Sequence, residues 1–137
     1  RASDGKTSSM PKPESFVRRA EDVKAETWTD ARGTLSFHTL VSGDVTPSNG
    51  LVAGVSTLEP GCALALHSHE QAEVYFALEG AAVVTVDGVD RTVSAGAAVF
   101  IPGGALHTVR NPFKEVFKIF YVFPADRFDD IKYKFVD

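Results

Sequence analysis

The sequence predicts an all-β domain in which antiparallel sheets pack together as a sandwich or a barrel. From Gly33 onward, short stretches of alternating apolar and polar residues recur, with Gly, Pro, Asn or Asp between them. Asp87-Gly88, a pair that tolerates the positive φ angles of a two-residue hairpin turn, lies between two such stretches. The 137 residues are 44% hydrophobic and include ten Phe, which is enough to fill the core of one domain.

The chain opens with nine small, polar residues that show no pattern. We interpret residues 1–9 as a vector-derived or disordered leader before a native start at Met10, and residues 10–137 as a single domain. In the next segment, apolar residues recur at roughly helical spacing behind a serine that could cap a helix, which predicts a short helix or an extended arm. These residues are Ser15, Phe16, Val17, Ala20 and Val23.

Each later element is a short apolar or alternating run, as expected of strands in an antiparallel sheet. Turn residues separate the runs, for example in SGDVTPSNG, EPG, PGG and NPFKE. The predicted strands span residues 34–41, 51–58, 63–69, 73–78, 83–86, 89–93, 98–101, 106–110, 116–123 and 131–136.

Composition excludes several classes of function. The formal net charge of -4 provides no basic field for a nucleic acid, so the expected partner is a small neutral or cationic molecule. No apolar run approaches the roughly twenty residues of a membrane span. The single cysteine, Cys62, excludes an intramolecular disulfide and suits a reducing compartment. We therefore expect a cytoplasmic protein without a membrane partner.

Three polar residues with metal-binding side chains lie close together in the segment 61–80. His67 and His69 are two positions apart on a predicted strand and therefore share a face, and Glu73 follows a short turn. Two imidazoles and a carboxylate that converge form a metal site short of one ligand. His107, the only histidine further along the chain, could supply it from across a barrel. The pattern predicts one divalent transition metal, and Fe, Mn, Ni, Cu and Zn are all compatible with these ligands.

The alternative for this cluster is a polar face on an exposed strand. We favour a lined cavity, because alternation places small residues on the same face as the histidines and the glutamate. These small residues are Ala63, Ala65 and Ala77.

Other reactive or aromatic residues are expected to have a structural role and not a catalytic one. His38 is expected to be solvated or hydrogen-bonded, and alternation places Cys62 on the face opposite His67 as a packing residue. The Phe-rich strand 116–123 is expected to belong to the core or to the interface of a homodimer.

The spacing of these residues resembles the two motifs of the cupin family. The first motif matches residues 61–80 and the second matches residues 96–111. The matching positions are Gly61, His67, His69, Glu73, Gly80, Gly96, Pro102, Gly104, His107 and Asn111. The resemblance implies a cupin jelly-roll barrel, or double-stranded β-helix, of two packed antiparallel sheets. It also implies metal ligation by His67, His69, Glu73 and His107.

Within that family the chain resembles the small single-domain lyases that cleave dimethylsulfoniopropionate (DMSP) to dimethyl sulfide and acrylate. A tyrosine, Tyr75, follows the glutamate ligand at the same distance, and the ending YVFPADRFDDIKY brings a second one, Tyr133. The resemblance implies that the metal acts as a Lewis acid, that Tyr75 is the catalytic base and that Tyr133 is a pocket or auxiliary residue. Aromatic rings could hold the sulfonium by cation–π attraction.

Three alternatives remain open at this stage. Tyr75 could instead be a packing residue of the cavity wall. A cupin dioxygenase would use the same metal centre without a tyrosine base, and a non-enzymatic sensor cupin would only bind a small molecule. Small cupins commonly form homodimers, which we expect here as well.

Overall fold

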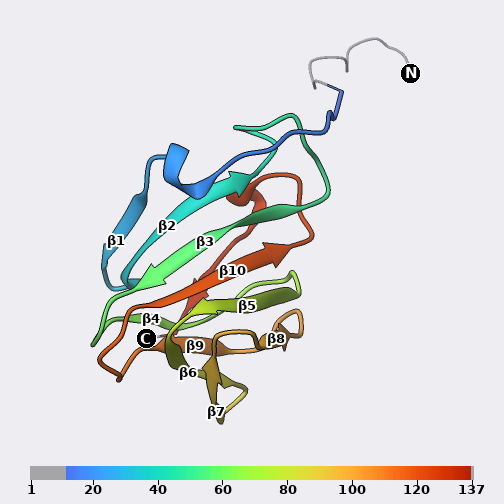
Figure 1. The fold of residues 1–137 in the computed structure, drawn as a ribbon. Helices are drawn as coiled ribbons and strands as arrows, with labels where there is room; N and C mark the ends of the chain where they lie inside the picture. The colour runs from blue at the N-terminus through green and yellow to red at the C-terminus, as the bar shows by residue number, and fades with distance from the viewer. Residues whose placement is uncertain (1–11, 137) are drawn as a thin grey trace.

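The computed structural model describes residues 12–136 and consists of two antiparallel sheets that face each other (Figure 1). The first sheet contains β1 (Glu26–Asp30), β2 (Gly33–Val41), β3 (Val52–Leu58), β10 (Phe117–Phe123), β5 (Glu73–Glu79) and β8 (Ala98–Ile101), in that order. The second contains β7 (Val89–Ser94), β6 (Ala81–Val86), β9 (His107–Arg110), β4 (Ala63–Ser68) and the short β11 (Lys134–Phe135). The leader predicted at residues 1–9 lies outside the described residues.

The two sheets close into a nearly complete barrel. Along one side, β2 meets β4 where Gly33 pairs with Leu64. Along the other side, the N–H of Gly96 donates to the carbonyl of Ala77, at 2.8 Å, just beyond the end of β7. Strands distant in sequence become neighbours, with β10 between β3 and β5 and β9 between β4 and β6, as in a jelly roll. The predicted all-β class and antiparallel barrel are confirmed.

The barrel interior is apolar because successive strand residues point to opposite sides. In β10, Phe117, Ile119, Tyr121 and Phe123 are buried, whereas the residues between them are half-buried on the outer side. The inward residues of this strand therefore belong to the core, one of the two locations expected for them.

The hairpin predicted at Asp87-Gly88 joins β6 to β7. Both residues have positive φ angles, 48° and 81° respectively. Such angles twist the turn in the same sense as the strands that it connects. The prediction is confirmed, with strands slightly longer than the sequence indicated.

Of the two forms predicted for the segment before the barrel, a short helix or an extended arm, the structure is closer to the extended arm. Apart from one 3-10 turn, η2 (Ala20–Asp22), it is not helical, and the chain then forms β1. This strand was not predicted, because only Trp28 among its five residues is even partly buried and no alternation is visible. Pairing with β2, from Glu26 opposite Phe37 to Asp30 opposite Gly33, stabilises it instead.

The strand predicted at residues 131–136 is also shorter than expected. A 3-10 turn, η3 (Phe128–Asp130), precedes it, and only β11 pairs with a neighbour. Ile131 is nevertheless buried, and Tyr133 and Phe135 are half-buried against the core. Every second residue of this segment therefore packs towards the core, although most of the predicted strand is not regular.

Neither helical turn found between residues 12 and 136 is long and apolar enough to cross a membrane.

Candidate metal centre

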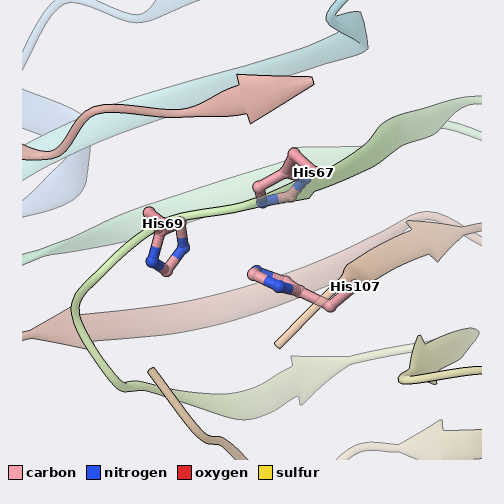
Figure 2. Close-up of side chains that lie close together, drawn as sticks. All are labelled: His67, His69 and His107. Atoms are coloured by element: carbon pink, nitrogen blue, oxygen red, sulfur yellow. The ribbon is translucent and has the colours of Figure 1, made fainter. Parts of the chain in front are cut away.

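Three histidines from two neighbouring strands converge inside the barrel (Figure 2). His67 lies on β4, His69 follows the end of that strand, and His107 opens β9. One ring nitrogen from each lies within 4.8 Å of the others, and all three residues are at least 98% buried. This arrangement could hold a metal ion.

An irregularity in β4 sets the direction of His67. Opposite β9, Leu64 pairs with Val109, and the next recorded pair is His67 with His107, so β4 carries one residue more than its partner. Such a bulge reverses the alternation on one strand and re-aims the following side chain. Leu64 and His67 therefore both point inward.

Because of the bulge, part of the prediction that small residues share the face of the histidines is wrong. Ala63 and Ala65 were predicted to share a face with the histidines, but they are half-buried, while Leu64 lines the interior. Ala77 on β5 is fully buried as expected. On β4, the side chain that lines the cavity is therefore Leu64, and not the two alanines that were predicted to do so.

Hydrogen bonds fix the orientation of each imidazole. The Nδ1 atoms of His67, His69 and His107 lie 2.7, 2.9 and 2.9 Å from the backbone carbonyls of Ala65, Gln71 and Ala105. A carbonyl only accepts, so Nδ1 of each ring carries a proton. In His67 and His107 the second nitrogen, Nε2, has no hydrogen-bond partner within the described part of the chain and can offer its lone pair to a metal.

The Nε2 atoms show that a metal would fit. Those of His67 and His107 are buried and have no hydrogen-bond partner among residues 12–136. A buried ring nitrogen with a free lone pair normally costs free energy, which a bound cation would remove. Burial, with a smaller contribution from His107, lowers the pKa of His67 to about 3, so its ring is neutral and able to ligate near pH 7.

Glu73, the first residue of β5, completes the predicted set. Its side chain is 4% exposed, and its Oε1 lies 3.1 Å from Nε2 of His69 and 3.4 Å from Nε2 of His107. The structure thus brings all four predicted residues together at one point. Three imidazoles and one carboxylate suit a divalent transition metal, and the donor set does not select one.

Two of the motif residues hold the loops around the centre. The N–H of Gly104 donates to the carbonyl of His69, at 2.8 Å, and so connects the turn before β9 to the end of β4. The buried Asn111 side chain donates to the carbonyls of Leu58 and Glu115 and accepts from the N–H of Phe113. These contacts keep the strands that carry the histidines in a single arrangement.

A cavity of about 30 Å³ adjoins the centre. Glu73 lines it together with Tyr75, Tyr121 and Tyr133, which are all three tyrosines of the chain. The Tyr133 ring stacks on His67, with centroids 4.9 Å apart. Ser56 and several apolar side chains complete the wall. The apolar residues are Trp28, Leu35, Phe37, Leu58, Leu64, Val109, Ile119 and Phe128.

Burial raises the pKa of Tyr75 well above its usual range, and the negative charge of Glu73 raises it further. The same two causes raise the pKa of Tyr133. Without a cation at the centre, both phenols therefore keep their protons near neutral pH.

Tyr121 is the cavity residue that sequence reasoning missed. Its place on a Phe-rich strand suggested core or interface, and alternation did put it on the inward face. Alternation alone does not say which inward residues meet the cavity, because that depends on strands paired across the sheet. The structure places Tyr121 directly opposite Tyr75 in the pairing of β10 with β5.

Comparison with known proteins fits this geometry. A family model described as the cupin domain matches residues 54–123, more than half of the chain, and this range includes all four residues of the centre. The chain belongs to the cupin family. In this cupin, the first motif carries His67, His69 and Glu73, and the second carries His107.

Two characterised proteins are similar to this cupin in sequence. Dimethylsulfoniopropionate lyase DddW of Ruegeria pomeroyi is 37% identical over 118 residues, which cover 85% of this chain and 76% of the lyase. An oxalate-binding protein of Thermotoga maritima is 27% identical over 100 residues, covering 70% of this chain and 83% of that protein.

Solved structures confirm the fold of the cupin. The polyketide cyclase RemF of Streptomyces resistomycificus has a TM-score of 0.78 at 21% identity, covering 90% of this chain and 87% of its own. A Thermotoga maritima protein described as a predicted oxalate decarboxylase has a TM-score of 0.73 at 24% identity, covering 80% and 99%. Both show the jelly-roll fold, which matches the predicted fold class.

Proposed function

We propose that this cupin is a metal-dependent lyase that cleaves DMSP to dimethyl sulfide and acrylate. The observation that carries the proposal is that Tyr75 and Tyr133 line one cavity with Glu73, beside the three histidines. The similarity to the DMSP lyase of Ruegeria pomeroyi supports the choice of substrate.

Substrate binding divides between two parts of the cavity. A divalent metal held by His67, His69, Glu73 and His107 would act as a Lewis acid for the substrate carboxylate and make its α-proton more acidic. The sulfonium end of the substrate is a cation, and the aromatic rings of Trp28, Tyr133 and Phe128, which line the cavity, can attract it.

Tyr75 acts as the base in the elimination. Its phenolate oxygen takes the proton from the carbon next to the carboxylate, and the C–H electron pair forms the new carbon–carbon double bond. The bond between the β-carbon and sulfur breaks at the same time, and sulfur keeps that electron pair. Neutral dimethyl sulfide and acrylate result, and the tyrosine then returns its proton to water.

The electrostatics of the cavity make this base dependent on a cation. Tyr75 is buried beside the negative Glu73, and both factors oppose its ionisation. A positive charge at the centre reverses the sign of the local field and favours the phenolate. Tyr133 is positioned to assist as a neutral hydrogen-bond donor, because its ring is held by stacking on His67.

A binding protein for small carboxylates is the second candidate. The similarity to an oxalate-binding protein favours it, since the same four-residue centre would hold a carboxylate without any reaction. A dioxygenase would also use this centre, but it would not need Tyr75 as a base.

The deciding experiment measures dimethyl sulfide in the headspace above metal-loaded protein and DMSP. We expect gas from the wild type and at least about 100-fold slower release from Tyr75→Phe, the lower range for loss of a general base. Metal content is measured in both proteins, because the comparison requires equal loading.

Each contrary result points to a different function. If no gas appears with Fe, Mn, Ni, Cu or Zn, the lyase proposal is wrong, and calorimetry with oxalate then tests the binding protein. Oxygen consumption by iron-loaded protein would indicate the dioxygenase. Equal gas release from Tyr75→Phe would retain the lyase and exclude Tyr75 as its base.

A further inference from the structure

The proposed reaction uses two of the three tyrosines in the cavity and leaves Tyr121 without a role. Tyr121 is only 4% exposed, and its hydroxyl is buried with no hydrogen-bond partner among residues 12–136. Thr39 lies near enough to oppose the rise in the pKa of the phenol, but the two hydroxyls are not in the geometry of a hydrogen bond. A buried, unpaired polar group costs about 1–3 kcal/mol of stability.

The neighbouring strand makes room for this hydroxyl. Gly54 on β3 pairs directly with Tyr121, and a Cβ at Gly54 would clash with the Tyr121 hydroxyl. Glycine inside a strand weakens it, and it often marks a place where another group approaches the backbone closely. A Cβ at Gly54 would also meet the backbone carbonyl of His38, so the glycine serves the close approach of β2 as well as the space that the hydroxyl occupies.

Packing alone does not account for a tyrosine at this position. The other inward residues of β10 are Phe117, Ile119 and Phe123, and the chain uses Phe ten times but Tyr only three times. A phenylalanine at position 121 would fill the same space without an unpaired hydroxyl. The hydroxyl is thus explained by a partner that enters the cavity from outside the chain.

Such a partner must accept a hydrogen bond. Burial, together with the negative charge of Glu73, raises the pKa of Tyr121, so the phenol stays protonated and offers its hydrogen. The cavity also contains the Glu73 carboxylate and the Ser56 hydroxyl, but neither forms a hydrogen bond with Tyr121, and the remaining lining side chains are apolar or tyrosines. An anionic oxygen is the strongest acceptor for a buried donor.

We propose that the Tyr121 hydroxyl donates a hydrogen bond to the carboxylate of a small organic acid bound in the cavity. The inference rests on the proposed function in one respect, because the carboxylate is the only acceptor group that DMSP carries. It extends that function by assigning Tyr121 to substrate binding, separate from the proton transfer by Tyr75.

The test combines ligand binding and stability in Tyr121→Phe. The probe is propionate, a carboxylate without a sulfonium group, titrated into metal-loaded protein by calorimetry. Loss of one hydrogen bond to a charged group should raise the propionate Kd about tenfold. The DMSP KM should rise similarly, with kcat within about twofold, because the contact is made before and during the reaction. The thermal midpoint of ligand-free protein should stay equal or rise, because an unpaired hydroxyl is removed.

Thr39→Val is the matched control. It removes a hydroxyl that lies beside the Tyr121 phenol with little change in the size of the side chain, and it should leave the propionate Kd unchanged. An equal effect in Thr39→Val and Tyr121→Phe would show a structural pair and overturn the inference. An unchanged Kd in Tyr121→Phe, a lowered midpoint of that variant, or a wild type that does not bind propionate would overturn it as well.

These measurements separate this inference from the proposed function. If the wild type releases no dimethyl sulfide but Tyr121→Phe still weakens propionate binding, the lyase is wrong and the carboxylate contact stands. If gas is released and propionate binding is the same in both proteins, the lyase stands and the role of Tyr121 is wrong.

Discussion

The four histidines of the chain differ in what surrounds their rings. His38 donates from Nδ1 to the carbonyl of Val23, at 2.7 Å, as the three clustered histidines do with carbonyls of their own. It is half-exposed on β2, whereas Nε2 of His67 and of His107 is buried without a partner. A histidine on a strand therefore becomes a candidate ligand through the environment of its second nitrogen, and sequence alone does not reveal that environment.

The ligand assignment predicts different results for two histidine variants. His69→Ala should lose most of the bound metal, because two imidazoles and a carboxylate remain at a buried centre that can no longer enclose the ion. His38→Ala should retain wild-type metal content. Inductively coupled plasma mass spectrometry on dialysed protein measures both, and a full equivalent of metal in His69→Ala would refute the assignment.

At the scale of elements, a bulge in one strand and a hydrogen-bonded loop after another position the residues of the site, in addition to regular strand pairing. The bulge in β4 turns Leu64 and His67 inward together. The loop after β9 depends on Asn111, which is 1% exposed and makes side-chain hydrogen bonds of 2.8–3.0 Å to both flanking segments. Asn111 is one of the fixed positions of the second cupin motif. In the structure, its side chain holds the loop after β9 by hydrogen bonds.

Asn111→Ala should destabilise the protein by about 1–3 kcal/mol, because it leaves the buried carbonyl of Leu58 and the partly buried backbone groups of Phe113 and Glu115 without their partner. Urea denaturation of metal-free protein measures the change. Asn49→Ala, at the only other asparagine, removes an exposed side chain and should stay within about 0.5 kcal/mol of the wild type. Similar losses in the two variants would mean that the bridge across this loop is not needed.

For the whole molecule, burying the His67 imidazole inside the barrel links stability to pH. Burial lowers the pKa of His67 to about 3 in the folded, metal-free protein, whereas the unfolded chain retains a value near 6.5. Between these values the unfolded state binds more protons than the folded state. The stability that the neutral ring provides is therefore complete above pH 6.5 and is lost as the pH falls towards 3.

Metal-free protein should accordingly lose stability between pH 6.5 and 4, by at most about 1.4 kcal/mol per pH unit for this one group. His67→Gln, which cannot take up a proton in this range, should show a shallower dependence. Chemical denaturation at a series of pH values, with chelator present, measures both slopes. The same slope in the two proteins would place the acid sensitivity elsewhere.

Much of this molecule could be predicted from local signals in the sequence. Alternation and turn residues are properties of neighbouring positions, so they located the strands from β2 to β10 and the Asp87-Gly88 hairpin. The motif spacing identified His67, His69, Glu73 and His107 as one group. Local signals failed where a segment depends on its partner, as in β1, whose exposed residues are ordered by pairing with β2.

Local patterns along the chain predicted the all-β class, the cupin family and the four residues that meet at the candidate metal centre. Long-range strand pairing was needed to find that Leu64 shares the inward face with His67, and that Tyr121 lines the same cavity as Tyr75 and Tyr133. These two kinds of information differ because the underlying interactions have different ranges. Turn geometry and alternation act between adjacent residues, whereas a bulge or a shared cavity arises from strands that pair after long separations in the chain.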